Sequence, residues 1–206
     1  MRKTKTVLHW PTIAADPMKW RHVNDFTHVR LYHFCRPTDI NTYLTQGIRL
    51  FQHDEQEQKF HELFSDLPQN VRDRAIEASI HRKLPLRVDA AIDDRYMAEN
   101  AVHYAALGSE TIQGMVNWLP ERDKHRKRLV ATGQAAVIVF EAPVEDLEAR
   151  AVKELDMYLT LLAEGAYENF SGEGHLTGFC FSFFKTVPPE WITKYEYLDP
   201  KKFKRD

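Results

Sequence analysis

Cysteine is scarce in this chain, with only Cys35 and Cys180 among 206 residues. So few cysteines exclude a disulfide framework and a zinc site built on cysteine pairs, and they indicate a reducing compartment. No apolar run approaches the roughly 18 residues that a membrane span needs. The apolar stretch near Met1 is too short for a secretory signal. We therefore expect a cytoplasmic protein that does not enter a membrane.

Charge and composition set few further limits. The net charge is −2, and hydrophobic and charged residues make up 43% and 28% of the chain, as is ordinary for a globular protein. The length predicts one domain, residues 1–206, with a substantial core. His53, His61 and His81 lack the i, i+4 spacing of a helical zinc motif, so we expect no metal site.

The most informative stretch runs from His28 to Leu50. Residues 29–35 are β-branched and aromatic and predict a strand, with His33 near its end. Thr38 or Asp39 is suited to cap a following helix, and Gly47 is suited to end it. A histidine at the end of a strand, just before a turn into a helix, is well placed to face a cleft.

The rest of the chain alternates strand and helix patterns. Residues 51–83 predict two helices, separated by Pro68, with Asn70 as a cap for the second. Further helices are expected at 96–107 and 149–167, and further strands near 86–92, 135–142, 177–185 and 193–198. Residues 135–142 form a continuous apolar run, which is typical of a buried central strand. This order predicts an α+β domain.

The opening segment resembles the first motif of the ADP-ribosyltransferase superfamily, a Tyr-His strand followed by a short helix that ends in Gly-Ile or Gly-Leu. The matching residues are Tyr32, His33, Ile40, Tyr43, Leu44, Gly47 and Ile48. The resemblance implies a mainly antiparallel sheet split into two halves with a cleft between them, flanking helices, and 51–83 as a helical insertion. It also implies NAD as cofactor, with His33 on the ribose beside nicotinamide and Tyr32 next to it.

Two later segments extend the resemblance. Ala-Val-His-Tyr-Ala, ending at Ala105, is similar to a family motif whose aromatic residue stacks on nicotinamide, which implies this role for Tyr104, with Tyr96 in reserve. Val-Pro-Pro-Glu-Trp-Ile, ending at Ile192, is similar to the family's C-terminal motif. Arg36 and Arg30 are candidates for holding the pyrophosphate by charge-assisted hydrogen bonds.

The chain departs from the family at the catalytic carboxylate. The family places a glutamate on the strand before the Pro-Pro turn, whereas residues 178–185 contain no acid. We expect Glu173, between two glycines, to take this role from a loop, with Glu168 as the next candidate. Such a carboxylate holds the ribose 2′-hydroxyl and stabilises the oxocarbenium-like state as nicotinamide leaves.

Three functions remain open at this point. The first is an NAD-dependent ADP-ribosyltransferase of the intracellular toxin or defence type, with a nucleic-acid or protein acceptor and a possible antitoxin or regulatory partner. The second is a non-catalytic nucleotide- or partner-binding module on the same fold. The third is an enzyme similar to RNA 2′-phosphotransferases. Basic clusters at 122–128 and 201–205 could meet phosphates.

Overall fold

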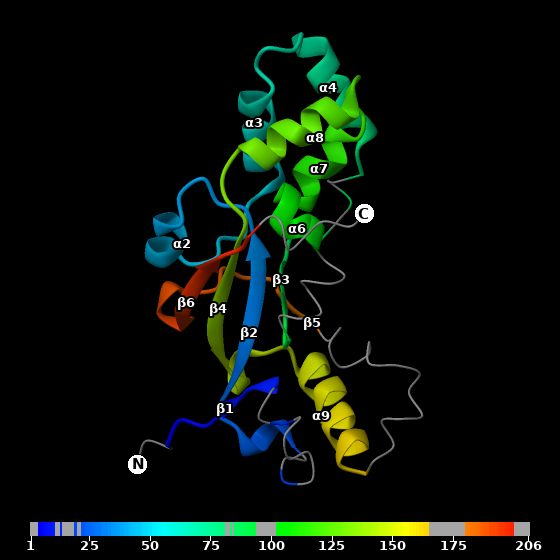
Figure 1. The fold of residues 1–206 in the computed structure, drawn as a ribbon. Helices are drawn as coiled ribbons and strands as arrows, with labels where there is room; N and C mark the ends of the chain where they lie inside the picture. Colours follow the sequence, from blue (N-terminus) through cyan, green and yellow to red (C-terminus); the bar gives the residue numbers. More distant parts are fainter. Residues whose placement is uncertain are drawn as a thin grey trace.

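The computed structural model describes residues 4–10, 13, 19, 22–80, 83, 85–93, 102–164 and 180–199. It is an α+β arrangement, as the order of elements predicts (Figure 1). The strands are β1 Val7–Leu8, β2 His28–Cys35, β3 Val88–Ala91, β4 Ala136–Pro143, β5 Cys180–Phe183 and β6 Ile192–Tyr197. The longer strands therefore lie where the apolar and aromatic runs predict them.

These strands form one sheet with the order β5-β3-β2-β4-β6, and β1 pairs with β2 off this path. All pairings are antiparallel except the short β1–β2 pair. Strand β2 pairs with β4 over its whole length, from His28↔Pro143 to Cys35↔Ala136. The apolar run of β4 is buried because core side chains cover both of its faces. The mainly antiparallel sheet that we expected is thus present.

The junction between β2 and β3 is narrow. Its register holds a single pair, Tyr32↔Ala91, whereas β3 pairs with β5 over four residues, from Val88↔Phe183 to Ala91↔Cys180. The expected two separate halves are therefore replaced by one sheet with a weak seam. Next to this pair, the His33 side chain of β2 contacts the carbonyl oxygen of Asp89 in β3 at 2.9 Å.

The described helices are α2 Asn41–Gln46, α3 His53–Leu63, α4 Gln69–Ala78, α6 Val102–Leu107, α7 Glu110–Val116, α8 Arg122–Ala131 and α9 Ala149–Ala163, with 3₁₀ turns at Val23–Asp25, Val144–Asp146 and Pro189–Trp191. Helix α4 starts two residues earlier than predicted, with Pro68 rather than Asn70 at its cap, since proline's missing N–H costs nothing at a helix start. Gly47 ends α2 with a positive φ of 77°, as expected. In the described residues, no helix is long and apolar enough to cross a membrane.

Within the described residues, three apolar cores organise these elements. The first covers one face of the sheet and includes Leu31, Ile138 and Phe140, against which Leu155 and Leu159 of α9 pack. The second covers the opposite face with Phe34 and Val137 beside α6. The third lies within the helices α3, α4, α7 and α8, which gather at one end of the sheet (Figure 1). This helical cluster, residues 53–78 and 110–131, therefore has a core of its own.

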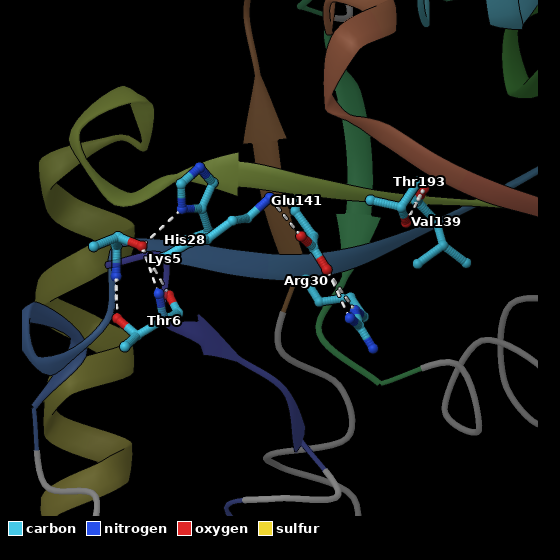
Figure 2. Close-up of polar contacts among 8 residues, drawn as sticks. Lys5, Thr6, His28, Arg30, Val139, Glu141 and Thr193 are labelled. Atoms are coloured by element: carbon cyan, nitrogen blue, oxygen red, sulfur yellow. Dashed lines mark hydrogen bonds and ion pairs between the residues drawn. The ribbon is translucent and has the colours of Figure 1, made fainter. Parts of the chain in front are cut away.

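A buried carboxylate fastens the other end of the sheet. Glu141 of β4 is 7% exposed, and its Oε1 accepts hydrogen bonds from Arg30 of β2, at 2.6 Å from Nη2. Lys5 Nζ lies 2.8 Å from Oε2 of the same residue. Figure 2 shows both cations converging on Glu141 from neighbouring segments. Since both carboxylate oxygens are satisfied, this ion cluster ties the N-terminal segment to the two central strands.

Candidate functional site

A cavity of about 300 Å³ opens at the seam between β2 and β3. One wall is the end of β2, from His33 to Arg36, and a second is the segment 85–89 that leads into β3. Helix α3 with the residues before it, and the turn between α6 and α7, form the remaining walls. The cavity thus lies between the sheet and the helical cluster, and its volume is at the lower end of the range for small-molecule sites.

His33 is held at the seam by the backbone of β3. Its Nδ1 lies 2.9 Å from the carbonyl oxygen of Asp89, which only accepts, so Nδ1 carries the proton and donates. Burial lowers the pKa of His33 below its ordinary value of 6.5, outweighing the opposite effect of the Asp89 contacts. The ring is therefore neutral at pH 7. Its Nε2 is left as a hydrogen-bond acceptor in a cavity wall.

Tyr104 of α6 lines the same cavity, and its side chain packs against the second core. Burial, followed by the charge of Glu110 and a hydrogen bond from the tyrosine hydroxyl to it, raises the pKa of Tyr104. The ring also lies 4.2 Å from that of His103, centroid to centroid. Tyr104 is accordingly a neutral, partly buried aromatic ring whose hydroxyl is directed at a carboxylate.

Arg36 lines the cavity but is engaged in supporting its walls. Its Nη1 donates to the carbonyl of Ala105 at 3.1 Å, and its Nη2 donates to the carbonyl of Val130. These carbonyls belong to the last turns of α6 and α8, which lack partners within their own helices. Arg36 thus fixes two helix ends against the end of β2, and both of its terminal nitrogens are occupied.

The other predicted residues lie elsewhere. Tyr32 is not among the residues lining the cavity: it faces the second core, and its hydroxyl lies 3.0 Å from His9 Nε2. Adjacent strand residues point to opposite faces, so His33 and Tyr32 diverge. Arg30 pairs with Glu141 at the far end of the sheet. Glu173, Glu168 and Tyr96 lie outside the described residues.

Several charged residues in the cavity walls were not foreseen from the sequence. Arg49 pairs with Glu55 at 2.7 Å, and Arg87 pairs with Asp89 at 2.8 Å. Lys59 of α3 forms no ion pair within the part of the chain that the structure describes. Glu110 lies six residues after Tyr104, just past a Gly-Ser turn, and this closeness in sequence is the one signal that points to it. The others reach the cavity through the packing of the helical cluster.

The chemistry of these walls suits a polar organic ligand with anionic and hydroxyl groups. Among the described residues, no group of three histidine, cysteine or acidic side chains is arranged to hold a metal ion. Comparisons with protein-family models, curated proteins and solved structures gave no match for this chain.

Proposed function

We propose that this chain is an NAD-dependent ADP-ribosyltransferase and that the cavity at the β2–β3 seam binds the nicotinamide half of NAD. The observation that carries the proposal is that His33 and Tyr104, singled out by two separate sequence motifs, line one cavity although about 70 positions separate them.

Each of the two residues has a physical task in this proposal. The Asp89 carbonyl fixes the His33 tautomer, so that Nε2 accepts a hydrogen bond from a ribose hydroxyl. The Tyr104 ring stacks on the flat, cationic nicotinamide ring, which favours an electron-rich partner. Lys59, in the α3 wall, is placed to attract the pyrophosphate because it forms no ion pair among the described residues. Arg36 then serves the site by holding its walls.

The acceptor class and cellular role follow from the resemblance. We propose an intracellular enzyme of the toxin or defence type that transfers ADP-ribose to a nucleic acid or a protein. An antitoxin or regulatory protein would restrain its activity. Transfer of ADP-ribose from NAD releases nicotinamide, whichever acceptor receives the ADP-ribose. Nicotinamide release is therefore the readout that does not require the acceptor to be known.

A second candidate is a nucleotide-binding module without turnover. It is favoured by strand β5, Cys180–Phe183, which carries no carboxylate where the superfamily has its catalytic glutamate. Both candidates predict NAD binding in the same cavity. Only the transferase candidate predicts that nicotinamide is released. This holds whether or not a cell extract is added as a source of acceptor.

The experiment compares wild type, His33→Ala and His61→Ala. Each protein is incubated with NAD and cell extract, and the nicotinamide released is measured by chromatography. His61 is the matched control because it lies on α3, outside the cavity walls, and pairs loosely with Asp73 at 3.7 Å. We expect wild type and His61→Ala to release nicotinamide and His33→Ala to be at least about a hundredfold slower. Equal rates in all three would contradict the proposal, and NAD binding without release in any would favour the second candidate.

A further inference from the structure

The reaction proposed above requires a carboxylate close to the ribose, and the inference that follows rests on that proposal. Among the described residues, three carboxylates line the cavity, on Glu55, Asp89 and Glu110. A carboxylate that stabilises a developing cation must have an oxygen that is not already neutralised by a fixed arginine. The contacts of the three therefore decide which of them is suited to the task.

Glu55 has both oxygens engaged. Its Oε1 lies 2.7 Å from Arg49 Nη2, and its Oε2 accepts a hydrogen bond from the backbone N–H of Gln52 at 2.8 Å. The second contact is half of a capping box at the start of α3. Glu55 thus starts a helix and neutralises an arginine.

Asp89 is engaged in the same way. Arg87 Nε donates to its Oδ2 at 2.8 Å, and the Ser182 hydroxyl donates to its Oδ1 at 2.5 Å. Ser182 is its register partner across the β3–β5 pair. Asp89 therefore joins two strands, and its side chain is held by an arginine and a hydroxyl.

Glu110 differs from both. It is the first residue of α7, its side chain is 54% exposed, and it lies in the cavity wall with Tyr104. The Tyr104 hydroxyl donates to it, and His103 Nε2 lies 3.9 Å away. No arginine or lysine in the described ranges forms an ion pair with it; Arg87, whose pKa the charge of Glu110 helps to raise, is ion-paired with Asp89 instead. Among the three, it is the carboxylate whose charge is left available to a ligand.

We infer that Glu110 is the catalytic carboxylate of this site, in place of a glutamate on the β5 strand. In the reaction, the bond between ribose C1′ and the nicotinamide nitrogen breaks, and its electron pair leaves with neutral nicotinamide. The Glu110 carboxylate stabilises the oxocarbenium-like state. The acceptor's oxygen or nitrogen, or a water oxygen, then bonds C1′ and gives its proton to Glu110, which releases it to solvent.

The test measures nicotinamide release and NAD affinity for wild type, Glu110→Gln and Glu77→Gln. Glu77 is the matched control, an exposed carboxylate on α4 outside the cavity. We expect Glu110→Gln to lose at least about a hundredfold in kcat, with NAD affinity by calorimetry within threefold of wild type and an unchanged circular dichroism spectrum. Glu77→Gln should match wild type.

A chemical rescue separates catalysis from a structural effect. Glu110→Ala should regain at least about tenfold in rate when formate is added, because a small carboxylate can occupy the vacated volume. Glu173→Gln tests the sequence-based alternative in parallel. Loss of activity in that variant together with full activity in Glu110→Gln would overturn the inference.

The two levels of proposal fail in different ways. An active wild type with an equally active, folded Glu110→Gln overturns the assignment of Glu110 and leaves the transferase proposal standing. A wild type that binds NAD but releases no nicotinamide overturns the transferase proposal and the assignment with it.

Discussion

Glu141 and Glu110 are carboxylates in opposite surroundings. Glu141, at the far end of the sheet, is 7% exposed and has a cation on each oxygen, Arg30 at 2.6 Å and Lys5 at 2.8 Å (Figure 2). Glu110, in the cavity wall, is 54% exposed and contacts a neutral tyrosine hydroxyl. The charge of Glu141 is neutralised by its two cations and offers nothing for a ligand to bind. The charge of Glu110 is available to a ligand.

The comparison separates the parts of the molecule that hold its shape from the parts suited to chemistry. The pKa of Glu141 is lowered: burial raises it, but the hydrogen bonds and charges of Lys5 and Arg30 together outweigh burial. Such a group contributes to stability. Residues of the shape-holding kind should therefore change unfolding when replaced, and residues of the cavity should change ligand binding.

The largest expected change in stability is at Gly47. Its φ is +77°, and a Cβ built there would lie 2.0 Å from the carbonyl oxygen of Val187. Gly47→Ala should cost about 3 kcal/mol, from the positive φ and the overlap with a fixed backbone atom. Gly114→Ala is the control, because its Cβ meets nothing within 4 Å and alanine favours a helix by about 1 kcal/mol. Urea unfolding of both variants measures the contrast, and equal midpoints would contradict it.

Glu141→Gln should come next, with a loss of about 2 kcal/mol in the free energy of unfolding. This is less than for a fully buried ion pair, because the Lys5 side chain is 53% exposed and partly screened. Nicotinamide release per folded molecule should not change, since the residue lies outside the cavity. If Glu141→Gln lost activity without losing stability, the distinction between shape-holding residues and cavity residues would be wrong.

The acid side of the pH profile sharpens the same prediction. Since the folded pKa of Glu141 lies below its ordinary value of 4.5, its contribution is present above that pH and is lost as pH falls through the folded pKa. Wild type should thus lose stability below about pH 4.5 more steeply than Glu141→Gln. Parallel curves for the two proteins would contradict this origin of the stability.

The smallest effect concerns Tyr104 and falls on binding. If its ring stacks on nicotinamide, Tyr104→Leu should weaken NAD binding by roughly tenfold, about 1.4 kcal/mol. Tyr104→Phe keeps the ring and should stay within about threefold, since a single hydrogen bond is worth about 1 kcal/mol or less. Calorimetry on both variants decides between ring and hydroxyl. A greater loss in the phenylalanine variant would exclude stacking as its main role.

The sheet could be predicted from the sequence because its strands are set by local patterns. The β-branched and aromatic runs at 29–35 and 135–142 lie within one residue of β2 and β4. The narrow β2–β3 seam could not be predicted from single-strand patterns, because it depends on which neighbour each strand pairs with along its length. The start of α4 at Gln69 was missed since the cap at Asn70 competed with Pro68.

The site was predictable in part. His33, Arg36 and Tyr104 do line one cavity, but the sequence does not indicate that Arg36 is occupied by the carbonyls of Ala105 and Val130. Tyr32 was grouped with His33 by adjacency, although neighbours on a strand face opposite ways. Lys59 approaches the cavity through the packing of the helical cluster, which no local motif encodes.

The most direct test of the account is calorimetric titration of NAD into wild type and His33→Ala, with both shown to be folded by circular dichroism. We predict saturable binding to wild type with one site, and binding at least about tenfold weaker to the variant, because the ribose hydroxyl loses its acceptor at Nε2. Equal affinities would show that His33 is not a ribose ligand. No heat of binding with wild type would contradict the assignment of the cavity to NAD.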